Sequence, residues 1–144
     1  MFNIGSITKI EIAPSDQITL GTPNATNEVT VTNSGTWDEP SFTIETASWS
    51  EDEKSKNAGN TYVSKLKYQV PKVDPANYQA AHKYKNVPVV VRITDGNSNK
   101  VVIGTPDRPV FITTSKSIPE KTAGINAYQF EVNFESPHPA YFSA

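Results

Sequence analysis

Apolar and polar side chains alternate along much of this chain, and that period-two pattern is typical of β-strands with one buried face. The alternation is clearest in NEVTVTN (27–33), TYVSKLKYQV (61–70) and AYQFEVNF (127–134). Shorter alternating or apolar stretches predict further strands at 7–12, 16–20, 41–49, 87–94, 100–104 and 109–114. We therefore predict an all-β protein, a β-sandwich or small barrel of seven to nine antiparallel strands, in a single domain over residues 1–144.

Three segments break the alternation. PANYQAAHKYKN (75–86) has a proline at its start and two adjacent alanines, so it predicts one short helix. SEDEKSKNAGN (50–60) is charged and lacks large apolar side chains, which favours a solvated loop or a long hairpin tip. The segment 135–144 carries Pro137 and Pro139, so we expect a proline-rich tail that cannot form a regular central strand.

Composition supports the all-β prediction. Val, Ile, Thr, Tyr and Phe supply most of the bulk, while eleven prolines and seven glycines interrupt the chain at short intervals. The sequence has no cysteine, which excludes a disulfide framework and a thiolate zinc site. No apolar run approaches the ~20 residues that span a bilayer, and the first residues do not form a signal peptide. We expect a soluble protein made in the cytoplasm, without membrane insertion.

Charge is distributed unevenly along the chain. Residues 1–53 hold nine acidic side chains and one basic side chain, a net charge of −8, whereas residues 54–144 hold twelve basic and six acidic ones, a net charge of +6. Acidic strands could lie beside basic strands within one sheet, or one acidic and one basic face could dock identical copies front to back. The two arginines, Arg92 and Arg108, form no cluster, so we expect no specific nucleic-acid binding.

The stretch DGNSNK (95–100) begins like a calcium-binding EF-hand loop, with Asp95, Asn97 and Asn99 at positions one, three and five. Position six should be glycine but is Lys100, and position twelve should be glutamate but is Pro106. We interpret the stretch as the tip of a β-hairpin, in which Gly96, Asn97 and Asn99 tolerate positive φ. The sequence predicts neither a metal site nor a cofactor.

Catalytic and sugar-binding patterns are weak. The two histidines, His82 and His138, match no catalytic or metal-ligand spacing, so we expect that the protein is not an enzyme. A hydrolase would need a pair of acids, or His82, in a cleft. Exposed Trp37 or Trp49 could instead form the stacking platform of a carbohydrate-binding or adhesion β-sandwich, which is the alternative function.

The order of features after residue 87 resembles small structural proteins of tailed bacteriophages, particularly the crAss-like and related phages of gut Bacteroidota. The resemblance rests on ITDGNSNK, followed by VVIGTPDRPV, FITT and the closing AYQFEVNFESPHPAYF. It implies a virion protein: a neck, connector or tail subunit that assembles into a ring in the host cytoplasm and contacts other virion proteins.

Extended loops and tails are the expected means by which such a subunit contacts its neighbours. The segments concerned are 50–60, the hairpin 95–100 and the tail 135–144. The candidate subunit contacts are Asp95, Asn97, Asn99, Lys100, His138, Tyr141 and Phe142. The alternative is that Tyr141 and Phe142 cover the core of their own domain.

Overall fold

A computed structural model describes residues 6–39, 47–57, 59–71, 83–118, 120 and 127–143, and it is nearly all β. The strands are β1 (Ile7–Pro14), β2 (Ile18–Leu20), β3 (Glu28–Val29), β4 (Val31–Asn33), β5 (Ser48–Lys56), β6 (Gly59–Pro71), β7 (Val89–Asp95), β8 (Lys100–Ile103), β9 (Ile112–Ser117), β10 (Ala127–Ser136) and β11 (Tyr141–Ser143). The 3-10 turn η1 (Ser15–Gln17) joins β1 to β2. The predicted fold class is confirmed.

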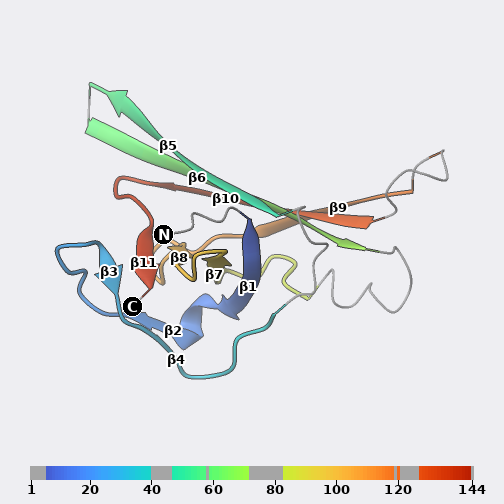
Figure 1. Cartoon of the computed structure of the whole chain (residues 1–144), viewed down its shortest axis with the longest axis horizontal. Helices are drawn as coiled ribbons and strands as arrows, with labels where there is room; N and C mark the ends of the chain where they lie inside the picture. The colour runs from blue at the N-terminus through green and yellow to red at the C-terminus, as the bar shows by residue number, and fades with distance from the viewer. Residues whose placement is uncertain are drawn as a thin grey trace.

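The strands form two main sheets that face each other (Figure 1). One sheet has the order β1-β7-β8-β11-β3 and the other the order β5-β6-β10-β9, while β2 and β4 form a two-stranded sheet. Neighbouring strands are antiparallel, except that β11 and β3 are parallel. The arrangement is that of a sandwich and not of a closed barrel. No helix in the described ranges is long and apolar enough to cross a membrane.

The main core lies between the two large sheets. From the five-stranded sheet it takes residues of β1, β7 and β8, such as Ile10, Val91 and Ile103, and from the other sheet it takes alternate residues of β6 and β10. Tyr68 of β6 stacks on Phe130 of β10, with 4.9 Å between ring centroids. The predicted alternation in these two strands is confirmed, because Leu66 is buried while its neighbour Lys65 is exposed.

A second, smaller cluster covers the opposite face of the five-stranded sheet. Ala13, Val90 and Val102 point to that side and contact residues of the two-stranded sheet, including Leu20 and Val31. Strand β7 is therefore buried on both faces, which explains why it belongs to the most apolar run of the sequence.

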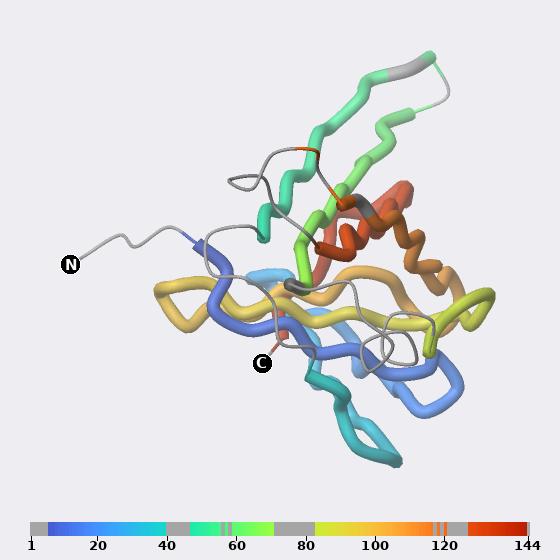
Figure 2. Tube along the Cα trace, turned by 90° about the vertical axis from the view of Figure 1, so that its right-hand side faces the viewer, coloured from blue at the N-terminus to red at the C-terminus, as the bar shows by residue number. Residues whose placement is uncertain are grey.

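Segment 50–60 forms the end of a long hairpin, one of the two predicted forms, and not a solvated loop. Residues 48–56 form β5, which pairs with β6 in an unbroken antiparallel register from Ser48 with Lys67 to Lys56 with Gly59. Four consecutive side chains of β5, from Glu51 to Lys54, are charged, and pairing with the long strand β6 supplies the backbone hydrogen bonds that the segment alone could not provide. The hairpin extends beyond the five-stranded sheet in both views (Figures 1 and 2).

The tail differs from its prediction. Residues 141–143 form β11, which lies inside the five-stranded sheet between β8 and β3. Pro137 and Pro139 lie in the connection after β10, so neither removes a donor from a sheet ladder. The prolines therefore mark the turn into a strand and do not prevent one. Of the predicted helix 75–86, only 83–86 falls within the described residues, and it forms turns.

Candidate functional site

The hairpin between β7 and β8 is confirmed, and its tip is organised by one carboxylate. Oδ1 of Asp95 accepts hydrogen bonds from the backbone N–H groups of Asn97 and Asn99, each at 2.9 Å. The backbone N–H of Ser98 donates to the carbonyl of Asp95 at 3.1 Å, and Ser98 has a φ of 67°. This geometry is a turn followed by one left-handed residue. The expectation of positive φ at Gly96, Asn97 and Asn99 is wrong, because Ser98 alone takes that conformation in the tip.

Two side chains hold β11 in its place. The Asn27 amide donates to the carbonyl of Ala140 at 3.0 Å, and the backbone carbonyl of Asn27 accepts from the N–H of Phe142 at 2.9 Å. The Glu51 carboxylate on β5 accepts from the N–H of Ala140 at 2.9 Å and from the hydroxyl of Ser64 at 3.2 Å. The connection before β11 is thus fixed to both the loop before β3 and the four-stranded sheet.

Two hollows lie on either side of Phe142, and several of the predicted contact residues line them. Phe142 is 43% exposed and pairs with Val101 of β8. On one side a groove of about 420 Å³ is lined by apolar side chains including Trp49, Ile93 and Val101. On the other side, a hollow of about 480 Å³ is lined by polar groups of the hairpin tip, including Asn99 and Lys100. We call these six residues the Phe142 face.

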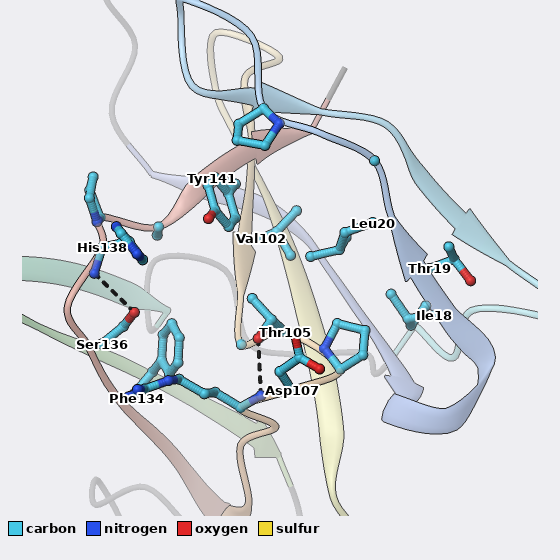
Figure 3. A pocket seen from close by; sticks show the side chains of 17 residues that line it. Ile18, Thr19, Leu20, Val102, Thr105, Asp107, Phe134, Ser136, His138 and Tyr141 are labelled. Carbon is cyan, nitrogen blue, oxygen red and sulfur yellow. Dashed lines mark hydrogen bonds between the residues drawn. The ribbon is translucent and has the colours of Figure 1, made fainter.

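Two other candidate contacts line a different cavity. His138 and Tyr141 border a space of about 560 Å³ between β2, the β8–β9 connection and the β10–β11 connection (Figure 3). Tyr141 pairs with Val102, whereas Phe142 pairs with Val101, so the two aromatic residues point to opposite faces of the sheet. Six of the seven candidates therefore divide between two surfaces, with Asp95, Asn99, Lys100 and Phe142 on one side and His138 and Tyr141 on the other. Asn97, exposed in the hairpin tip, lines neither of them.

The structure does not bring the two tryptophans together. Trp49 packs against the main core, opposite Leu66 of β6. Trp37 packs against the smaller cluster, and the Arg92 guanidinium lies 4.5 Å from the centroid of its ring. Both indoles are partly buried, and they belong to opposite sides of the five-stranded sheet. A shared stacking platform is not formed.

Other polar clusters serve the fold. Asp38 accepts hydrogen bonds from Tyr84 Oη at 2.8 Å and from Lys83 Nζ at 3.1 Å, which ties the segment before β7 to the segment after β4. Burial raises the pKa of the Tyr84 phenol, and the hydrogen bond to Asp38 raises it further. Burial likewise raises the pKa of Tyr68, with a smaller contribution from Asp38. Within the described ranges, no group of three or more His, Cys, Asp or Glu side chains is placed to hold a metal. His82 lies outside those ranges.

Comparison with models of protein families, with curated proteins and with solved structures gives no match. The class of protein is therefore defined by the fold alone: an all-β, sandwich-like domain.

Sequence reasoning missed Asn27 and Glu51. Asn27 has a φ of 63°, a conformation that asparagine adopts more readily than most residues, so PNATN (23–27) carried a signal for a tight turn. Asn24 strengthens that turn, because its side-chain oxygen accepts from the N–H groups of Thr26 and Glu28. Nothing in the sequence singled out Glu51 from the two acids that follow it.

Proposed function

We propose that this protein is a structural subunit that works by assembling with copies of itself and with other proteins, and not by chemistry. The virion role follows from the sequence resemblance: a neck, connector or tail subunit of a phage particle that assembles in the host cytoplasm. The observation that carries the assembly proposal is the Phe142 face. An exposed aromatic ring with an apolar groove on one side and a polar rim on the other is the usual anatomy of a protein–protein contact.

The contact we propose joins the Phe142 face of one copy to the projecting β5–β6 hairpin of the next. Asp52 and Glu53 are exposed on that hairpin, next to Lys54, and Lys100 lies at the rim of the Phe142 face, where Glu28 also borders the hollow. Opposite charges would orient the two surfaces, while burial of Phe142 would supply apolar contact area. Because the two surfaces differ, the contact is head-to-tail and leads to a ring when its rotation closes.

The experiment compares two substitutions of exposed phenylalanines. Phe142→Ser should abolish or strongly weaken self-association, because it removes the aromatic centre of the proposed contact. Phe111→Ser is the matched control, since Phe111 is 53% exposed but lies before β9, away from the Phe142 face. Light scattering coupled to size-exclusion chromatography gives the mass of each species, and electron microscopy shows whether large species are rings or tubes.

Three results would contradict the proposal. The first is a wild-type chain that stays monomeric both alone and with the other proteins of its particle. The second is a Phe142→Ser variant that assembles as well as the wild type. The third is an equal loss in both variants, which would point to general apolar adhesion. Circular dichroism of each variant checks that the fold is intact.

A further inference from the structure

The cavity bordered by His138 and Tyr141 has the side chains of a small-molecule site. Its volume of about 560 Å³ falls within the ~300–1,000 Å³ of ligand pockets. Ile18, Val102 and Phe134 are buried and supply an apolar floor, and Tyr141 adds a partly buried ring (Figure 3). In that view His138 lies beside Ser136, and Asp107 lies beside Thr105.

Three polar side chains at the rim are available to a ligand. Asp107, Arg108 and His138 are exposed, and none of their side chains makes a hydrogen bond or ion pair with another described residue. A guanidinium offers donors in a planar fork, a carboxylate offers acceptors, and an imidazole can do either. The rim therefore presents both kinds of hydrogen-bonding group around an apolar floor.

The backbone beneath these side chains is held in place. In the turn 105–108, the N–H and carbonyl groups of Thr105 and Arg108 bond to each other at 3.1 Å, and Thr105 Oγ1 also accepts from the N–H of Arg108 at 3.0 Å. Gly104 precedes the turn with a φ of 87°, a conformation that favours glycine. In the connection before β11, the N–H of His138 donates to Ser136 Oγ at 3.1 Å. A site on a fixed backbone loses less entropy when a ligand binds.

The charges at the rim identify the class of ligand. Asp107 and Arg108 are neighbours of opposite charge, so the rim has no excess of positive charge to hold a phosphate or carboxylate. An entirely apolar ligand would form no hydrogen bonds with these exposed groups. We propose that the cavity binds a neutral saccharide, whose adjacent hydroxyls both donate and accept hydrogen bonds and whose C–H face packs on apolar and aromatic side chains.

This inference does not rest on the proposed assembly. Tyr141 and Phe142 point to opposite faces of the five-stranded sheet, so a ligand at the cavity would not cover the Phe142 face. The site also differs from the platform predicted at exposed Trp37 or Trp49, since each of these indoles packs against an apolar cluster.

The test is ligand-observed NMR and calorimetry with neutral mono- and disaccharides at millimolar concentration, using the full chain. We expect binding by the wild type, and affinities at least about tenfold weaker for Arg108→Ala and for Asp107→Asn, because each loses charge-assisted hydrogen bonds. Lys116→Ala is the matched control for loss of an exposed cation and should bind like the wild type, since Lys116 lies on β9.

Several outcomes would overturn the proposal. One is a wild-type chain that binds no saccharide of the panel. Another is binding that neither rim substitution weakens, which would place the saccharide elsewhere. A third is binding of inorganic phosphate or a free amino acid in place of sugars, which would assign the cavity to a charged ligand. Circular dichroism confirms that each variant is folded.

Discussion

Glu11 of β1 and Arg92 of β7 form an ion pair on the face of the five-stranded sheet that carries the smaller cluster. The guanidinium donates to both carboxylate oxygens, at 3.1 and 2.8 Å, and it also stacks on Trp37. Only 4% of the Glu11 side chain and 14% of the Arg92 side chain are exposed. Breaking such a buried pair leaves one charge without a partner in a medium that solvates it poorly.

Glu11→Gln should therefore destabilise the protein by about 3 kcal/mol, because the amide keeps the shape of the side chain but not its charge. Chemical denaturation followed by circular dichroism measures the free energy of unfolding. Glu131→Gln is the matched control, since Glu131 pairs with Lys65 at the surface and should tolerate the change. Equal free energies of unfolding for the two variants would show that the charge of Glu11 does not stabilise the fold.

The burial of Glu11 could not be predicted from the local pattern. ITKIEI alternates in the way of a strand with one wet face, and Glu11 falls on that face. The structure buries it because the Trp37 segment covers the strand, with Asp38 bridged to Ile12. Which segment returns to cover a strand depends on tertiary contacts, and periodicity carries no information about them.

The position of strand β11 likewise could not be predicted from the local sequence pattern. Long strands such as β6 and β10 were predictable because apolar and polar residues alternate repeatedly along them. A three-residue strand after two prolines carries no such pattern, and its place between β8 and β3 depends on hydrogen bonds to Asn27 and Glu51. The candidate site was predictable in part, since the hairpin and Phe142 were both named, but their proximity was not.

Removal of residues 137–144 should destabilise the whole domain. Among the described strands, β3 has no sheet partner except β11, and β8 would lose the neighbour on one side. We expect a lower melting temperature by circular dichroism, together with broadened NMR signals. An unchanged melting temperature would show that β11 is dispensable to the fold, and would leave the tail free to contact a neighbouring subunit.

Asn27→Gly offers a milder version of that test. Glycine keeps the positive φ but lacks the amide that donates to Ala140, so a loss of about 1 kcal/mol in the free energy of unfolding is expected. No loss would mean that the sheet ladder alone holds β11.

At the scale of the molecule, the uneven charge is partly neutralised within the fold. Glu11 and Asp38 from the acidic part pair with Arg92 and Lys83 from the basic part. Asp52 has no ion partner among the residues that the structure describes, and it is exposed on the projecting hairpin. Acidic and basic residues therefore pair within the domain, while the projecting hairpin carries acidic Asp52 and Glu53 beside basic Lys54.

Self-association should weaken as salt rises, because the Debye length falls from about 10 Å at 0.1 M to about 3 Å at 1 M. Asp52→Asn should reduce that salt dependence, whereas Asp16→Asn, at an exposed position on η1, should not. Light scattering at low and high salt provides the masses. If the mass of the assemblies does not change with salt, charge does not contribute to self-association, and apolar contacts alone hold the subunits together.

The position of β11 has a consequence for the synthesis of this protein. Asn27 and Ala140 are 113 residues apart, and the parallel pair β3–β11 closes a loop of similar length. Pairing over such distances is slow, and it cannot begin until residues 141–143 have left the ribosome. In a chain interrupted before that point, the five-stranded sheet lacks β11, and β3 has no partner strand in that sheet. Truncated products should therefore be recognised and degraded by cellular proteases more readily than the finished chain.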